Sequence, residues 1–361
     1  MQIVEFLKRI TEASGVSGAE AEVAGIVAES FRAWADEVRT DALGNVIALK
    51  RGQGALAGER PRIMLAGHMD EIGLMITQID RGFLRFATVG GFDERTLPGQ
   101  EVTVHGRRAL PGVIGCRPPH VLTPAENERV VPLADLFIDV GLEAGALAEA
   151  VAVGDVVTLR RDLVQLAGDC LVAKGLDDRA AVAAIGVALE MLASRQHMWD
   201  VFAVATVQEE VGLRGAITSA YGLAPHLAIA SDVTFGNQSG VPESQTMTVG
   251  GGPAIGLGAN FHPRVHERLV ETAKKHEIPH QIEPTPGRSG TDAWAIQVTR
   301  EGIPTALLSI PLRYMHTSVE MVNVRDVERT GRLMAEFIAG LDQAFAQELS
   351  VQVRRLSGIG G

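Results

Sequence analysis

The feature that most constrains this chain is an apolar run that leads directly into two acidic residues. The run covers residues 201–207 (VFAVATV), and Glu209 and Glu210 follow it after one glutamine. A stretch with β-branched residues and no polar alternation is typical of a strand buried on both faces of an α/β sheet. Ligands of open α/β sheets bind at the carboxyl ends of the strands. The run therefore predicts an α/β fold with a site at this edge, although a solvated glutamate pair would give the same pattern.

Four further residues with metal-binding side chains stand at the ends of predicted elements. Each has an ordinary alternative, because a histidine after a strand can be a surface residue and an aspartate before a helix can be its N-cap. His68 is followed two residues later by Asp70, whose carboxylate can accept the second ring N–H of a ligating imidazole. The four are His68 after the strand 62–67, Asp177 before the helix 180–192, Asp232 after the strand 227–231 and His316 after the strand 304–310.

Together with Glu210, these four residues form a set that suits two divalent ions. Two histidines and three carboxylates, one of them bridging, supply three protein ligands to each ion and leave room for a shared water. Nitrogen and oxygen ligands without sulfur suit zinc, cobalt or manganese. Such ions lower the pKa of the shared water from about 15.7 towards about 7. The set therefore predicts a hydrolase with two divalent ions per subunit.

The segment between His68 and Asp177 has a different pattern. Between residues 72 and 162, short alternating segments are separated by glycine and proline turns, which predicts a small β-barrel or sandwich. Within it, residues 117–132 have little apolar pattern and are broken by Pro118, Pro119 and Pro124, which indicates an exposed arm. We expect a catalytic domain of residues 1–71 and 168–361, interrupted by an inserted β-rich domain of residues 72–167.

Charge and cysteine content narrow the class of protein. The chain has 33 basic and 44 acidic residues, and the resulting formal charge of −11 argues against a nucleic-acid partner. Cys116 and Cys170 have no paired spacing, so neither a disulfide framework nor a cysteine zinc site is expected. The amphipathic N-terminus lacks the features of a signal peptide, and no apolar run reaches membrane-spanning length. We expect a cytoplasmic protein that binds neither nucleic acid nor membrane.

Six stretches carry motifs that are specific in combination. They are residues 66–73 (AGHMDEIG), 174–179 (KGLDDR), 207–212 (VQEEVG), 231–234 (SDVT), 290–293 (GTDA) and 313–318 (RYMHTS). In this order they resemble the successive motifs of the tetrahedral (TET) aminopeptidases, which include deblocking and glutamyl aminopeptidases and some members labelled cellulase or endoglucanase. The resemblance covers essentially the whole chain. It implies a three-layer α/β/α metallopeptidase domain with a mixed sheet and an inserted barrel-like domain.

The resemblance also implies a role for each residue of the site. Glu209 is the general base, and a cis peptide bond is expected between Asp177 and Asp178. The remaining roles are Asp177 as the bridging ligand, His68 and Asp232 at one metal ion, Glu210 and His316 at the other, and Asp70 as the partner of His68.

Two segments depart from the family pattern. Thr317 stands where serine is common and Ser318 where proline is common, which affects the local geometry of that loop. Residues 235–239 (FGNQS) differ from the family's expected loop, which has an acidic residue and a Pro-Gly pair. The substrate side chain that the pocket prefers is therefore left open. We expect substrate contacts from Arg288, Gly290 and Thr291. Arg288 is predicted to favour acidic side chains, with an exposed loop arginine as the alternative.

The expected activity is removal of N-terminal residues from short peptides by a hydroxide that bridges the two metals. A deacylase or carboxypeptidase of the same clan and an inactive scaffold are the alternatives. A glycanase would need paired carboxylates that flank a glycosidic bond. The arm of residues 117–132 and its apolar residues further predict a homo-oligomer, namely a tetrahedral dodecamer built from dimers.

Overall fold

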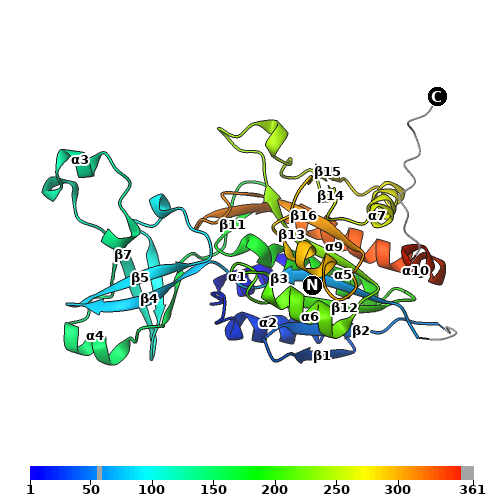
Figure 1. Cartoon of the computed structure of the whole chain (residues 1–361), viewed down its shortest axis with the longest axis horizontal. Coiled ribbons are helices and arrows are strands. Elements are labelled where there is room, and N and C mark those ends of the chain that lie inside the picture. Colours follow the sequence, from blue (N-terminus) through cyan, green and yellow to red (C-terminus); the bar gives the residue numbers. More distant parts are fainter. Residues whose placement is uncertain (55–58, 351–361) are drawn as a thin grey trace.

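The computed structural model describes residues 1–54 and 59–350 and divides them into a large α/β body and a smaller barrel (Figure 1). The large body is built on a mixed sheet of eleven strands among these residues. The strand order along its main path is β1-β2-β12-β3-β13-β16-β17-β11-β10, and β14 and β15 branch from β16. The four central strands β12, β3, β13 and β16 are mutually parallel, so their carboxyl ends meet at one edge. This edge is where the sequence predicts the site.

The strands of the sheet have these bounds: β1 Glu37–Thr40, β2 Val46–Lys50, β3 Arg62–His68, β10 Val164–Gln165, β11 Cys170–Ala173, β12 Asp200–Thr206, β13 Leu227–Phe235, β14 Ala254–Leu257, β15 Gln281–Pro284, β16 Thr305–Arg313 and β17 Glu320–Asn323.

Helices cover both faces of the sheet, which confirms the expected three layers. Successive residues of a strand point to opposite faces, and β3 shows the consequence. Ile63 and Leu65 pack under one layer of helices, whereas Met64 and Ala66 pack under the other. The first layer consists of α1 Ile3–Glu12, α2 Ala21–Phe31, α5 Leu176–Ala193, α7 Pro263–Lys275, α9 Val324–Ala339 and α10 Gln343–Ser350, and the second of α6 Arg214–Leu223 and α8 Asp292–Gln297.

The predicted insert is a closed six-stranded antiparallel barrel with its own apolar core. A short helix, α4 (Ala144–Ala150), packs Leu147 into this core. The barrel lies beside the α/β body, joined to it by narrow connections (Figure 1). Its strands are β4 Gly73–Asp80, β5 Phe83–Val89, β6 Glu101–His105, β7 Ala109–Gly115, β8 Phe137–Asp139 and β9 Val156–Leu159.

The arm of residues 117–132 leaves the barrel between β7 and β8. It contains one helical turn, α3 (Pro124–Asn127), which begins with a capping box between Thr123 and Glu126. Val121 and Val130 are 59% and 54% exposed, so the arm is the exposed segment that the prolines predicted. No described helix is long and apolar enough to cross a membrane.

Two element boundaries differ from the sequence prediction. β13 continues to Phe235 and does not end before Asp232, because β16 pairs with it as far as Leu312. β3 pairs with β13 only as far as Ala230, so Asp232 lies beyond the paired residues of these two strands. Also, β10 falls within residues 72–167 of the predicted insert, yet it pairs with β11 of the large sheet.

Candidate metal centre

The elements of the large body bring all the predicted ligands to one edge of the sheet. His68 is the last residue of β3, and Asp232 stands on the neighbouring strand β13. Glu210 lies in the turn after β12, and His316 lies in the loop after β16 with a left-handed φ of 58°. Such a backbone conformation costs about 1–3 kcal/mol in a residue other than glycine and is concentrated at functional sites.

Asp177 occupies the middle of this group. Its Oδ1 lies 3.2 Å from Nε2 of His68, and its Oδ2 lies 3.4 Å from Nε2 of His316. Nε2 of His316 is also 3.5 Å from Oε1 of Glu210. Burial acts to raise the pKa of Asp177, but the interactions with His316 and His68 outweigh it and hold this pKa well below its usual value. A carboxylate with one oxygen towards each histidine has the geometry of a bridging ligand.

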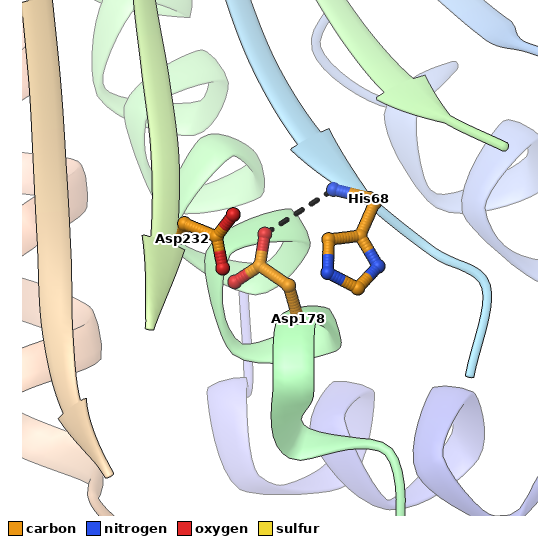
Figure 2. A group of neighbouring side chains, drawn as sticks. All are labelled: His68, Asp178 and Asp232. Carbon is orange, nitrogen blue, oxygen red and sulfur yellow. Dashed lines mark hydrogen bonds between the residues drawn. The ribbon is translucent and has the colours of Figure 1, made fainter. Parts of the chain in front are cut away.

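A second group of possible ligand atoms surrounds His68 on its other side. Atoms of His68, Asp178 and Asp232 all lie within 4.8 Å of one another (Figure 2). Oδ2 of Asp178 accepts a hydrogen bond from the backbone N–H of His68 at 3.2 Å, and Oδ1 is buried with no hydrogen-bond partner among the described residues. Burial and the charge of Asp232 raise the pKa of Asp178, and burial with the charges of Asp177 and Asp292 raises the pKa of Asp232. Desolvated carboxylates that repel one another favour a bound cation, so this side chain set fits divalent metal ions.

The pair Asp177 and Asp178 does not cap α5. Both residues have non-helical backbone angles, with ψ of 104° at Asp177 and 33° at Asp178, and their carboxylate oxygens contact the backbone of His68 and the rings of His68 and His316. The N-cap alternative is therefore wrong, because both carboxylates turn inwards and are buried. The peptide bond between them is cis, which confirms the sequence prediction.

Asp70 supports the centre in two ways. Its Oδ1 lies 3.5 Å from Nδ1 of His68, in the predicted partner position. The same carboxylate accepts the backbone N–H groups of Glu209 at 3.0 Å and Glu210 at 3.2 Å, and it accepts the hydroxyl of Ser17 at 2.6 Å. Asp70 thus orients the glutamate pair as well as the imidazole. No sequence pattern predicts the contacts with the glutamate pair.

Glu209 differs from its neighbour Glu210 in its surroundings. Its Oε2 lies 3.8 Å from Nε2 of His68, and its carboxylate forms no hydrogen bond within residues 1–54 and 59–350. Burial raises the pKa of Glu209 to about 10, with a further contribution from the charges of Asp232, Asp292 and Glu210. A carboxylate that stands free beside the predicted ligands is placed to exchange a proton with a substrate.

Two buried acids near the centre were not identified from the sequence. Glu320, the first residue of β17, accepts the backbone N–H of Asp177 at 3.0 Å and that of His316 at 2.9 Å. Asp292 accepts the hydroxyl of Thr206 at 2.6 Å, and burial raises its pKa to about 6. Glu320 therefore fixes two ligand-bearing segments that are far apart in the sequence, which no local pattern can indicate.

The centre opens into a cavity of about 470 Å³. Arg288, Gly290 and Thr291 all line it, as predicted. The guanidinium of Arg288 stacks on the ring of Trp294, 3.9 Å from the ring centroid, and Thr291 caps α8. The preference of Arg288 for acidic side chains stays a prediction.

The barrel also reaches the centre through the turn that follows β5. A Cβ added to Gly91 would lie 3.0 Å from Nδ1 of His316, and one added to Gly90 would lie 3.4 Å from Cβ of Glu210. Gly90 has a φ of 80°, a conformation that favours glycine. The inserted domain therefore supplies part of the wall behind two predicted ligands.

Comparison with known proteins identifies the family. Residues 44–333 match the M42 glutamyl aminopeptidase family. The chain belongs to the M42 family. This confirms the resemblance, the predicted fold and the enzyme class, an aminopeptidase that hydrolyses peptide bonds.

Individual M42 relatives match over nearly their whole length. The lysyl aminopeptidase of Pyrococcus furiosus is 38% identical over 337 residues, which cover 91% of this chain and 94% of the relative. The structure of aminopeptidase APDkam598 from Desulfurococcus kamchatkensis has a TM-score of 0.90 at 38% identity and covers 98% of this chain and 99% of its own. The TET1 peptidase of Pyrococcus horikoshii, which assembles into a tetrahedron or a large octahedral shell, has a TM-score of 0.83 at 34% identity, with 94% and 100% covered.

Proposed function

We propose that this M42 aminopeptidase is a dinuclear metalloenzyme that removes N-terminal residues from short peptides. The observation that carries the proposal is the position of Asp177, with one carboxylate oxygen towards His68 and the other towards His316. Zinc or cobalt, with manganese as a third candidate, suits these nitrogen and oxygen ligands. In the proposed arrangement Asp177 bridges two ions, His68 and Asp232 complete one site, and Glu210 and His316 complete the other.

Asp178 stays outside this ligand set. Its Oδ2 already accepts the backbone N–H of His68, whereas the two carboxylate oxygens of Asp177 face the imidazoles of His68 and His316. Its contribution is to hold the end of β3 in place, so that the imidazole of His68 faces Asp177.

The chain's own groups move the proton during hydrolysis. Bound divalent ions would supply Lewis-acid chemistry, since they polarise the scissile carbonyl and make a water easier to deprotonate. Glu209 takes the proton of the attacking water while the oxygen of this water bonds to the carbonyl carbon. Glu209 then gives the proton to the leaving amine as the C–N bond breaks. Asp70 keeps Glu209 in position through its backbone N–H.

The free substrate amine is the feature that separates an aminopeptidase from its alternatives. We propose that the surplus of carboxylates around the cavity attracts this ammonium group. A deacylase or carboxypeptidase of the same clan would not need it. Family membership does not decide which N-terminal residue is preferred, because the family is named for glutamyl substrates and the Pyrococcus furiosus relative for lysyl substrates.

We further propose that the enzyme works in the cytoplasm as a homo-oligomer, a dodecamer built from dimers. The exposed arm with Val121 and Val130 supplies apolar surface for a two-fold partner. The assembly of the related TET1 peptidase into a tetrahedron supports this proposal. Enclosed sites would admit short or unfolded chains and exclude folded proteins. Light scattering at micromolar concentration tests it, since a mass near the 38.4 kDa monomer would contradict any assembly.

The central test combines metal counting with matched substrates. Protein treated with a chelator is reloaded with zinc, cobalt or manganese and analysed by inductively coupled plasma mass spectrometry. We expect two ions per chain and release of p-nitroaniline from aminoacyl substrates but not from their N-acetylated forms. One ion per chain would refute the dinuclear centre. Equal turnover of blocked and unblocked substrates would favour the deacylase alternative.

A further inference from the structure

An acidic side chain outside the metal centre lines the same cavity. Glu283 stands on β15 and is half-buried in the wall. Both of its carboxylate oxygens accept hydrogen bonds from hydroxyl groups, one from Thr234 at 2.5 Å and the other from Ser309 at 2.6 Å. It forms no ion pair with a cationic side chain in the described part of the chain. A partly desolvated carboxylate held only by neutral donors keeps a net negative charge that a cationic ligand can neutralise.

The place of Glu283 relative to the centre is fixed by the strand register. Thr234 stands two residues after Asp232 on β13, so both side chains lie on the same face. Two residues of a strand span about 6.6 Å. Ser309, the other donor, is the register partner of Asp232 on β16. The Glu283 carboxylate therefore lies one long side chain away from the predicted ligand Asp232, along the cavity wall.

The other charges of the wall do not neutralise Glu283. Arg288 lines the cavity but stacks on Trp294, whereas the Glu283 carboxylate is held by Thr234 and Ser309. Phe235, at the end of β13, lines the cavity and is 61% exposed. Further apolar residues, among them Leu213, Leu307 and Met315, line the same cavity. An apolar surface that leads to a carboxylate matches a side chain with an alkyl stem and a cationic end.

We propose that Glu283 is a specificity-determining residue that selects peptides whose N-terminal residue is lysine or arginine. The inference rests on the proposed aminopeptidase reaction and adds the substrate class. The scissile carbonyl would lie at the metal centre, the alkyl stem of the N-terminal residue runs along the cavity wall, and the ammonium or guanidinium group donates to the Glu283 carboxylate. Thr234 and Ser309 hold this carboxylate in place, so little conformational freedom is lost on binding.

The test compares two substrates of similar shape that differ in charge. Lysyl and norleucyl p-nitroanilides share an alkyl chain, but only the lysyl substrate carries a side-chain ammonium. We measure kcat/KM for both substrates with the metal-loaded wild type, Glu283→Gln and the matched control Glu301→Gln. Glu301 is exposed and lines a different cavity. The arginyl and glutamyl substrates complete the panel.

We expect the wild type to prefer lysine over norleucine and arginine over glutamate. Glu283→Gln should reduce the lysine to norleucine ratio of kcat/KM roughly 10- to 100-fold, the usual range for a charge-assisted hydrogen bond. Glu301→Gln should leave this ratio at the wild-type value. The ratio separates recognition from a structural role, because a distorted wall lowers turnover of both substrates alike.

Other results overturn the inference. Equal losses on the lysyl and norleucyl substrates would make Glu283 a structural residue of the wall. A wild type that prefers glutamyl substrates, and that loses this preference in Arg288→Ala, would assign specificity to Arg288. Hydrolysis of every substrate without discrimination by charge refutes the role of Glu283 but leaves the proposed aminopeptidase function standing. Absence of turnover on all aminoacyl substrates refutes the proposed function and this inference with it.

Discussion

Two clusters of buried charged residues in this molecule are built from the same two segments of the chain. One is the metal centre, and the other, the rear cluster, consists of Glu71, Lys174 and Arg179. The segment after β3 supplies Asp70 to the metal centre and Glu71 to a cluster behind it. The segment around the start of α5 supplies Asp177 to the centre and Lys174 to the cluster behind. In the rear cluster one carboxylate and several backbone carbonyls bind the two cations, whereas the centre has a large surplus of carboxylates.

Every charge in the rear cluster has a partner. Lys174 Nζ lies 2.9 and 2.8 Å from the two carboxylate oxygens of Glu71, and Arg179 donates to Glu71 at 3.1 Å. Arg179 also donates to backbone carbonyls, to those of Ile10 at 2.6 Å and Ala13 at 2.9 Å at the end of α1 and to that of Met69 at 3.0 Å after β3. Cations are stabilised at a helix C-terminus. This cluster joins α1, β3 and α5 without any external ligand.

The difference between the clusters indicates which of them has a chemical role. Burial of a charge is costly unless a partner neutralises it. The rear cluster meets this condition internally and serves to hold the fold. The centre meets it only with protons or bound cations, so its stability and its chemistry depend on what it binds.

The largest effect should come from removing the general base. We expect Glu209→Gln to lower kcat by roughly 10²–10⁴-fold, the usual contribution of a positioned base, while the protein keeps its metal content and fold. Glu210→Gln is the control, because loss of a predicted ligand should lower the metal content as well. Metal analysis and steady-state kinetics check both variants. A metal-depleted Glu209→Gln would show that the roles of the two glutamates are exchanged.

Disrupting the rear cluster should reduce stability rather than chemistry. Glu71→Ala leaves Lys174 and Arg179 buried without a carboxylate, and the free energy of unfolding should fall by about 3–5 kcal/mol. The control is Glu29→Ala, which breaks the exposed pair with Arg9 and should cost less than about 1 kcal/mol. Chemical denaturation measures both. Similar losses for the two variants would remove the distinction between buried and exposed pairs here.

Removing the metal should make stability depend on pH. In the metal-free protein, burial raises the pKa of Glu209 from 4.5 to about 10, and the interactions with Asp177 and Glu210 raise that of His316 from 6.5 to about 11. The folded state then holds protons more tightly than the unfolded state. The stability from each group is complete below its unfolded pKa and is lost as pH rises through its folded pKa.

Metal ions replace these protons, so the metal-loaded protein should escape this loss. Calorimetry of chelated and reloaded protein at pH 6 and pH 9 tests the expectation. The gap in melting temperature between the two forms should widen at the higher pH. A gap that narrows would mean that the metal does not displace protons from these groups.

The smallest effect should come from Glu320, which contacts the centre only through backbone N–H groups. Glu320→Gln keeps one carbonyl acceptor and loses the other, so one of the segments with Asp177 or His316 is released. We expect metal affinity to fall roughly 10- to 100-fold, as for other residues that orient ligands. Titration with a competing chelator measures it, with Glu328→Gln on the exposed side of α9 as the matched control. An unchanged affinity would limit Glu320 to packing.

The comparison also shows what the sequence can and cannot predict. His68, Glu210 and His316 follow apolar strands, and parallel strands place their ends at one edge, so their proximity is predictable from the pattern alone. Asp177 and Asp178 are adjacent in the sequence. Which of their two carboxylates faces the histidines depends on the backbone conformation at these residues. Glu320 and Glu71 depend on contacts across more than 100 residues of sequence, and such contacts have no local pattern.

The turn after β5 has a consequence for exchanging parts between relatives. Because the bare backbone of Gly91 lies against the imidazole of His316, the barrel cannot be exchanged by preserving its two connections alone. A chimaera that carries another relative's barrel needs a residue without a side chain at this position. A Cβ at position 91 would lie 3.0 Å from Nδ1 of His316, so a larger residue would shift this predicted ligand by a few tenths of an ångström even if both parts folded correctly.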